Sequence, residues 1–335
     1  MKVTIITDRF PPQSATSGLL AYSSAIELSQ LGHEVQIVTH QPTNENISPP
    51  NLPDRVQLLQ SFRNWGFLET SRLIPFLIQY RPDAIHLFPS GRDKSKKLFS
   101  LFNIISSARP VLGPIKLFTS ISHLDNFAEG LLVNLARGSD LITFTAEDRQ
   151  QGQSFVRRYN SNLDIKTLDP SLSFLTMIED SEMRLETNSR VLWIPNQLEE
   201  YIRSPQKLKK FEPVLSAESD LLILMSGAEL NQLNGSLRSL QNFLNKWNFG
   251  PRTLISHSWN PISVKTLQSS LTYVSIDALA TNSPLLKIIG QFCLLSEVPQ
   301  LVFENKKWTT KDFDNERLNF SQSENSLSRI YSQNI

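Results

Sequence analysis

The first forty residues constrain the fold more than any other part of the chain. The run Lys2–Thr7 is short, apolar and rich in β-branched residues, which is typical of a strand buried on both faces. Apolar residues recur at helical spacing after Gly18, with Ser17 as the expected N-cap and Gly32 as the expected C′ residue. Val35–Thr39 then predicts a second buried strand. Strand, loop, helix and strand form a βαβ unit, which places the first loop and the helix N-terminus at the carboxyl edge of a parallel sheet.

This loop and helix start have two interpretations. A small residue and a glycine at a helix N-terminus let a ligand approach free amides and the positive end of the helix dipole. The alternative is that any α/β protein begins in this way. A dinucleotide site is disfavoured, because the segment from Asp8 to Gly18 holds a single glycine and lacks the G-x-G-x-x-G pattern.

Composition narrows the class of protein. The chain has 335 residues, and 33 Lys and Arg nearly balance 32 Asp and Glu, so no nucleic-acid partner is predicted. Cys293 is the single cysteine, which excludes a disulfide within the chain, fits a reducing compartment and favours a buried structural thiol. No run of about 18 apolar residues occurs, and Asp8 and Arg9 interrupt the apolar start, so we predict a cytoplasmic protein. The five histidines have no metal-ligand spacing, and no metal site is predicted.

The rest of the chain continues the alternation of strands with helices, which predicts parallel sheets. The expected strands are 55–59, 84–88, 115–121, 141–145, 163–168, 190–194, 221–225 and 253–256, and the expected helices are 67–80, 94–107, 127–136, one from 146 and 237–247. We expect two doubly wound Rossmann-like α/β domains facing across a cleft, at 1–172 and 189–315. An acidic linker is expected at 173–188, and a tail at 316–335 is expected to pack back on the first domain through Leu327, Ile330 and Tyr331.

Several motifs carry a resemblance to a known family. They are Phe10-Pro11-Pro12, Gly18, Gly32-His33-Glu34-Val35, Pro82-Asp83-Ala84-Ile85-His86, the segment Ser275–Leu286 and the segment Ser296–Val302. In this order they resemble glycosyltransferases of the GT-B fold, specifically the large retaining family four. The resemblance implies transfer of a sugar from a nucleotide-sugar donor to a glycan or lipid-linked acceptor, in polysaccharide or glycolipid synthesis, without a metal or other cofactor.

The resemblance also implies site residues. His123 matches a histidine near the reacting centre, whereas its structural interpretation is a strand-end histidine capped by a carbonyl. Ser17 and Gly18 would face the donor from the first domain. Asp277 and Ser283 would bind it from the second, with Asp277 on the ribose.

The second domain departs from the family pattern where the diphosphate is gripped. Asn196 stands where a Gly-Arg pair is expected, so Arg203 or Lys207 would have to supply the cation. Ser269 replaces the first glutamate of a Glu-x7-Glu pair whose second member is Asp277. Two alternatives therefore stay open: a binding or scaffold protein with a degenerate donor site, and a nucleotide-sugar epimerase on the same fold, although no convincing set of carboxylates supports the epimerase.

A basic and aromatic segment offers a further choice. Its members are Arg92, Lys94, Lys96, Lys97 and Phe99. An amphipathic helix of this kind can lie on an anionic membrane surface, where lipid-linked acceptors are found. The alternative is an ordinary surface helix whose apolar residues cover the sheet.

Overall fold

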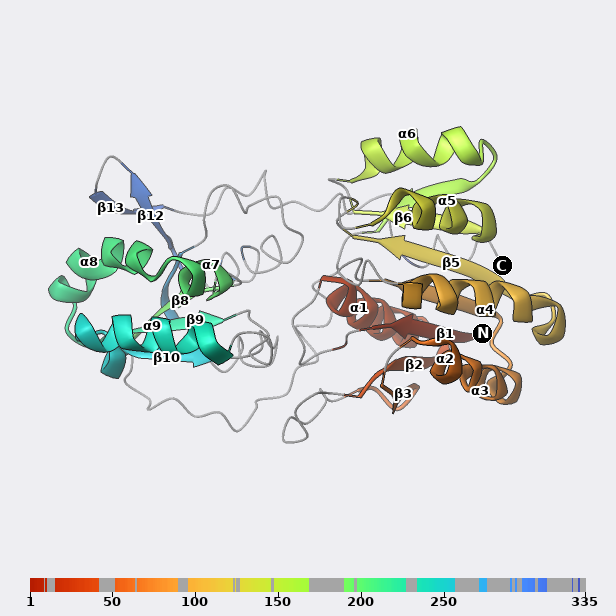
Figure 1. Ribbon diagram of the computed structural model, residues 1–335, viewed down its shortest axis with the longest axis horizontal. Coiled ribbons are helices and arrows are strands. Elements are labelled where there is room, and N and C mark those ends of the chain that lie inside the picture. Colours follow the sequence, from red (N-terminus) through yellow and green to blue (C-terminus); the bar gives the residue numbers. More distant parts are fainter. Residues whose placement is uncertain are drawn as a thin grey trace. The chain divides into compact units, whose positions relative to one another are not determined.

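The structure is a computed structural model of the 335-residue chain (Figure 1). It describes residues 1–8, 10, 16–41, 52–63, 65–89, 96–122, 124, 127–145, 148–168, 190–195, 198–226, 234–256, 271–275, 290, 293, 297–304, 307–311, 327 and 331. The chain forms two compact units. The first comprises Met1–Pro11, Ala15–Met177 and Phe320–Ile335, and the second comprises Pro12–Ser14 and Ile178–Asn319. The linker predicted at 173–188 lies outside the described residues.

The first unit alternates strands with helices as the sequence predicts. Its elements are β1 (Lys2–Thr7), α1 (Thr16–Gln30), β2 (Glu34–His40), β3 (Val56–Phe62), α2 (Phe67–Ser71), α3 (Leu73–Tyr80), β4 (Ala84–Phe88), α4 (Lys96–Leu112), β5 (Lys116–Ile121), α5 (Glu129–Gly138), β6 (Leu141–Phe144), α6 (Arg149–Tyr159) and β7 (Asp164–Thr167). The seven strands are parallel in the order β3-β2-β1-β4-β5-β6-β7. The order reverses between β1 and β4, which is the topological switch point of the sheet.

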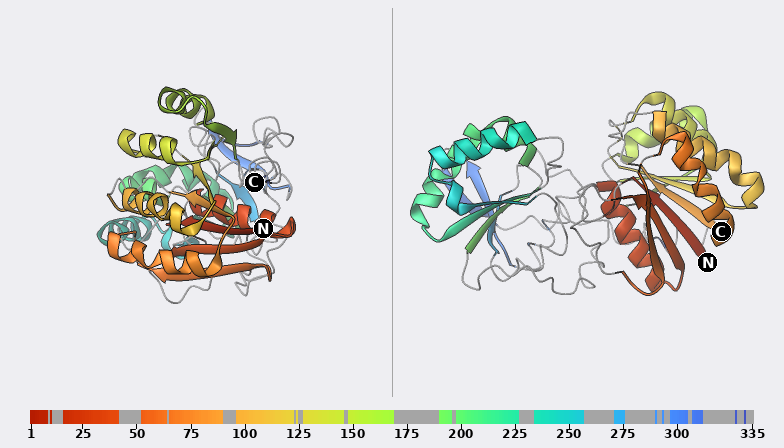
Figure 2. Two further views of the ribbon diagram at one scale, coloured as in Figure 1. Left: turned by 90° about the vertical axis from the view of Figure 1, so that its right-hand side faces the viewer. Right: turned by 60° about the horizontal axis from the view of Figure 1, so that its bottom comes forward.

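Helices cover both faces of this sheet (Figure 2). One hydrophobic core joins alternate strand residues such as Ile85 and Leu117 to residues of α3, α4, α5 and α6. Side chains alternate along a strand, so His86 and Phe118, which are register partners, point to the opposite face. Helix α1 contacts β1, β2 and β4 from that second face.

Two local predictions for the first unit are wrong. Helix α1 begins at Thr16, so Ser17 lies in its first turn and is not the N-cap. The helix expected over 67–80 is divided at Arg72 into α2 and α3, and Pro75 lies in the first turn of α3, where a missing N–H removes no helical hydrogen bond. The end of α1 follows the prediction. Gly32 has φ +87°, and the N–H groups of Gly32 and His33 donate to the carbonyls of Ser29 and Leu28 in a Schellman arrangement.

The second unit is a six-stranded α/β sheet (Figure 1). Its elements are β8 (Arg190–Ile194), α7 (Leu198–Arg203), the 3-10 helix η3 (Pro205–Phe211), α8 (Glu212–Ala217), β9 (Leu221–Ser226), α9 (Asn234–Lys246), the 3-10 helix η5 (Gly250–Arg252), β10 (Thr253–Ser256), β11 (Leu271–Val274), β12 (Gln300–Glu304) and β13 (Lys307–Lys311). The order is β10-β9-β8-β11-β12-β13. All pairs are parallel except β12 with β13, which are antiparallel.

The predicted fold class is therefore confirmed: both units are α/β with doubly wound, mainly parallel sheets. The sequence did not predict strands β11, β12 and β13 or the helices between β8 and β9. Strand β13 reads Lys-Trp-Thr-Thr-Lys, and an edge strand exposed in this way carries little apolar signal. The short helices break at Pro205 and Pro213, which removes the long helical period that reveals a helix in sequence.

Candidate functional site at the carboxyl edge of the first sheet

The switch point of the first sheet is where the fold best places a ligand. At the ends of β1 and β4, the hydroxyl of Thr7 donates to the carbonyl of Phe88 at 3.1 Å. This bond fixes the two central strand ends next to each other. Parallel α/β sheets bind ligands in such a crevice, outside the carboxyl ends of their strands.

The first turn of α1 follows β1 at this edge. The first turn contains no acidic side chain, so the positive end of a 15-residue helix is not neutralised from within it. Ser17 is only 3% exposed, and its Oγ has no hydrogen-bond partner among the described residues. A buried hydroxyl without a partner costs free energy, and functional sites are one place where such groups occur. Ser17 and the neighbouring buried Gly18 are the first-unit residues that the family resemblance predicts to meet a donor.

Phe10 gives the loop before α1 an anchor. Its ring is buried and lies edge-on to Tyr22 of α1, with ring centroids 5.6 Å apart. Burial also raises the pKa of Tyr22 to about 12, so this tyrosine stays neutral at physiological pH. Phe10 is thus attached to the helix that it precedes.

A second anchored loop lies further along the same edge. Asp148 precedes α6, and its carboxylate makes no capping bond to that helix. Instead, Asp148 Oδ2 accepts the main-chain N–H of Leu124 and the hydroxyl of Thr145, each at 3.2 Å. The carboxylate therefore joins the segment after β5 to the end of β6. Sequence analysis missed this role, because an aspartate directly before a helix predicts an N-cap, whereas this carboxylate bonds to the residues of other segments.

The ends of β2 and β3 hold two more buried polar groups. The Oγ1 of Thr39 and the indole Nε1 of Trp65 have no hydrogen-bond partner among the described residues, and Trp65 is 2% exposed. The Trp65 ring packs on His40 and Phe62, with centroids 4.5 and 5.6 Å away. Sequence reasoning assigned no role to these residues.

The structure describes only some of the other predicted site residues. His123, Asn196, Ser269, Asp277 and Ser283 lie outside the described residues, so their roles stay predictions. Arg203 is the last residue of α7, the helix that follows β8. A cation there lies at the negative end of the helix dipole, away from the end that begins next to β8. Lys207 lies in η3, and both side chains are exposed.

The predicted membrane segment is described only in part. Arg92 and Lys94 lie outside the described residues, and Lys96, Lys97 and Phe99 belong to the first turns of α4. Further along α4, Leu101, Phe102 and Ile105 are buried in the core of the first sheet, as a surface helix that covers the sheet requires. No helix in the described part of the chain is long and apolar enough to cross a membrane.

Cys293 is fully buried, as the composition predicts for a structural thiol. Burial raises the pKa of its thiol, so it is not poised to react. Within the described ranges, no group of three or more His, Cys, Asp or Glu side chains could hold a metal ion.

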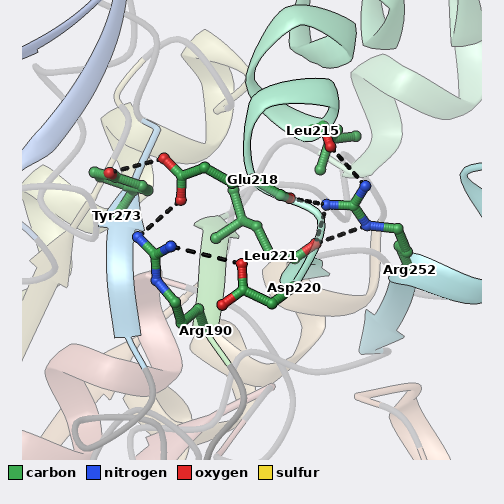
Figure 3. Close-up of polar contacts among 7 residues, drawn as sticks. All are labelled: Arg190, Leu215, Glu218, Asp220, Leu221, Arg252 and Tyr273. Atoms are coloured by element: carbon green, nitrogen blue, oxygen red, sulfur yellow. Dashed lines mark hydrogen bonds and ion pairs between the residues drawn. The ribbon is translucent and has the colours of Figure 1, made fainter.

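The second unit has its densest described polar network at the opposite edge of its sheet (Figure 3). Arg190, at the start of β8, pairs with Glu218 at 2.7 Å and with Asp220 at 3.6 Å, and Tyr273 donates to Glu218 at 3.0 Å. Arg252, just before β10, donates to the carbonyls of Leu215, Glu218 and Leu221. These residues lie at or near the amino ends of the strands, away from the edge where such sheets bind ligands, so we assign them to stability.

Comparison with known proteins finds structural matches only. No protein-family profile matches the chain, and no characterised protein matches it by sequence. Anabaena HepE in complex with UDP and glucose superposes with a TM-score of 0.57 at 11% identity, over 90% of this chain and 80% of that one. UDP-GlcNAc 2-epimerase from Methanocaldococcus jannaschii gives 0.55 at 12% identity, over 99% and 100% of the two chains. An α-glucosyltransferase in complex with UDP gives 0.55 at 11% identity, over 98% and 85%. Identity this low shows the fold, and the fold is GT-B.

Proposed function

We propose that the chain is a glycosyltransferase that moves a sugar from a nucleotide-sugar donor to a glycan or lipid-linked acceptor. The observation that carries the proposal is the first turn of α1 at the switch point, where a buried hydroxyl has no described partner and the turn itself carries no acidic side chain. A sugar hydroxyl or phosphate oxygen would supply the partner that Ser17 lacks. The ligands of the structural matches support this assignment, because HepE and the α-glucosyltransferase hold UDP.

The finer features of the proposal come from the family resemblance. We propose a retaining mechanism of the family-four type that needs no metal, with His123 beside the reacting centre and Asp277 and Ser283 on the donor. Arg203 or Lys207 would supply the positive charge that Asn196 does not. The acceptor and any contact with an anionic membrane belong to the same proposal.

An epimerase is the second candidate, because the UDP-GlcNAc 2-epimerase match extends over the whole of that enzyme. One experiment separates the candidates. The protein is incubated with UDP-, GDP- and ADP-sugars, its thermal unfolding is recorded, and the sugar product is identified by NMR. Donor binding should raise the unfolding temperature by mass action.

The glycosyltransferase, the epimerase and the scaffold protein give different results in this experiment. Release or transfer of the sugar with retained anomeric configuration supports the glycosyltransferase. Inversion at C2 with the nucleotide attached identifies an epimerase. Absence of any thermal shift with every donor would leave the scaffold protein with a degenerate donor site.

A further inference from the structure

Thr39 carries a buried hydroxyl at the carboxyl end of β2 that no described group satisfies. Its side chain is 1% exposed, and its Oγ1 has no hydrogen-bond partner among the described residues. A buried hydroxyl in this state costs free energy, and a ligand that bonds to it is one reason for a folded chain to keep it. The surroundings of Thr39 therefore decide whether a ligand is that reason.

The strand register places Thr39 on the side of the sheet that α1 covers. Ile37 of β2 pairs with Ile5 of β1, which pairs with His86 of β4. Side chains two residues apart on a strand share a face, so Thr39 shares the face of Ile37, and this is the face that α1 contacts. The packing of the other face agrees, because Val38 belongs to the core that holds residues of α3, α4, α5 and α6.

Ser17 lies at the same edge and on the same face. It is the second residue of α1, it is 3% exposed, and its Oγ also lacks a partner in the described part of the chain. In a βαβ unit the helix begins beyond the carboxyl end of the first strand. The first turn of α1 and the end of β2 therefore lie at one edge of the sheet, and each contributes one buried hydroxyl.

A third hydroxyl at this edge and face has a structural role. Thr7 is the last residue of β1, and its hydroxyl donates to the carbonyl of Phe88 at 3.1 Å. Phe88 is the last residue of β4, which lies on the opposite side of β1 from β2. This bond therefore leaves the β1–β2 part of the edge to Ser17 and Thr39.

Burial without a partner is by itself no sign of a ligand. Thr4 Oγ1 is also buried and without a described partner, but Thr4 lies inside β1 and pairs with Ile85 on the face of the apolar core. Ligands of parallel α/β sheets bind beyond the strand ends, where the core does not block them. Thr39 is the last residue but one of β2, at the edge that ligands use, so its position distinguishes it from Thr4.

The chemistry of the pair suits sugar hydroxyls better than phosphate. A serine or threonine hydroxyl both donates and accepts, whereas a phosphate oxygen only accepts and leaves the lone pairs of a buried hydroxyl unused. A sugar hydroxyl satisfies both functions. Asp8 directly follows β1 with a half-buried side chain, and its carboxylate disfavours a second anion at this edge.

We infer that Thr39 and Ser17 bind hydroxyl groups of the sugar in the nucleotide-sugar donor, and that Thr39 determines specificity for that sugar. The inference rests on the proposed function and names the part of the donor that meets the end of β2. Both residues belong to the first unit, so one unit makes both contacts.

The test compares the wild type with Thr39→Val, which keeps the shape of the side chain and removes the hydroxyl. Calorimetry measures Kd for three pairs of probes: UDP-glucose and UDP, GDP-mannose and GDP, and ADP-glucose and ADP. For a nucleotide sugar that binds, Thr39→Val should raise Kd by about two- to tenfold, the range for one hydrogen bond, with the Kd of the matching nucleoside diphosphate unchanged. Thermal unfolding of the free variant should occur at the wild-type temperature or slightly above it.

Two further variants control this result. Thr4→Val removes an equally buried hydroxyl away from the edge and should leave every Kd unchanged. Thr39→Ser keeps a hydroxyl and should bind the nucleotide sugar more tightly than Thr39→Val does.

The outcomes separate this inference from the proposed function. An unchanged Kd for the nucleotide sugar in Thr39→Val, or an equal rise for the nucleotide sugar and the nucleoside diphosphate, would overturn the inference while the proposed function stands. A clear loss of stability in free Thr39→Val would show that the hydroxyl bonds within the chain, which also overturns it. If the wild type binds none of the nucleotide sugars, the proposed function fails and the inference fails with it.

Discussion

Asp148 holds Leu124 through a hydrogen bond from a main-chain amide to a carboxylate, 3.2 Å long, between loops that follow different strands. Leu124 is the residue after His123, the proposed catalytic histidine. The bond therefore fixes a main-chain amide one residue after the position that the family resemblance assigns to the reacting centre.

Replacing Asp148 therefore tests this loop. Asp148→Ala removes the acceptor of both Leu124 and Thr145 and should lower the free energy of unfolding by about 1.5–3 kcal/mol, the range for hydrogen bonds to charged groups. Asp148→Asn keeps one acceptor oxygen and should lose less. Denaturant unfolding measures both. If His123 is catalytic, kcat should fall more than KM changes in Asp148→Ala; a loss of stability with unchanged kcat would separate the loop from catalysis.

Ser17→Ala should weaken the binding of a nucleotide sugar without lowering the stability of the free protein. The Ser17 hydroxyl is buried without a described partner, so its removal should leave the unfolding temperature of the free protein unchanged or raise it slightly. The stabilisation by the best nucleotide sugar should shrink, because in the proposed site the Ser17 hydroxyl finds its hydrogen-bond partner on the ligand. Ser23→Ala is the matched control, since the Ser23 hydroxyl donates to the carbonyl of Leu20 within the same helix. Equal donor binding by wild type and Ser17→Ala would remove Ser17 from the site.

Replacing two helical glycines with alanine should change the stability of the chain in opposite directions. A Cβ built on Gly152 of α6 would overlap the ring of Phe144, whereas one on Gly130 of α5 meets nothing within 4 Å. Gly152→Ala should therefore destabilise the chain by about 1–3 kcal/mol through overpacking. Gly130→Ala should stabilise it by up to about 1 kcal/mol through lower chain entropy. Chemical denaturation of both variants checks the pair, and a stabilising Gly152→Ala would show that Phe144 can move aside.

Replacement of the two arginines in Figure 3 should lower the free energy of unfolding by different amounts, measured by chemical denaturation. The Arg252 guanidinium is partly buried and is shared among three carbonyls, so Arg252→Ala should cost about 2–3 kcal/mol. Arg190 pairs with carboxylates while 39% exposed, so Arg190→Ala should cost at most about 1 kcal/mol, and less at high salt. A larger loss from Arg190→Ala would show that its pair with Glu218 and Tyr273 organises the sheet edge.

Local sequence signals found most of the fold. Strands β1, β4, β8 and β10 were predicted at their observed bounds, because each is a compact run of apolar or β-branched residues. The end of α1 was predicted because Gly32 is the residue that adopts positive φ without strain. Proline is the residue that most often interrupts a helix, but the helix over 67–80 is divided at Arg72, and Pro75 lies within α3. The break at Arg72 was therefore not predicted.

The sequence by itself determined the α/β class and the division into two units, and it predicted the carboxyl edge of the first sheet as a candidate ligand site, since these follow from periodicity and chain order along short stretches. Only the tertiary structure decided that Ser17 is buried without a described partner, that Asp148 reaches Leu124, and that Tyr331 meets His86 across 245 positions of chain. The positions of these residues depend on how the strands pair and on where the connecting segments bring the chain back to the sheet. Each of these contacts joins residues whose proximity exists only after the sheet has formed, so no local pattern encodes it.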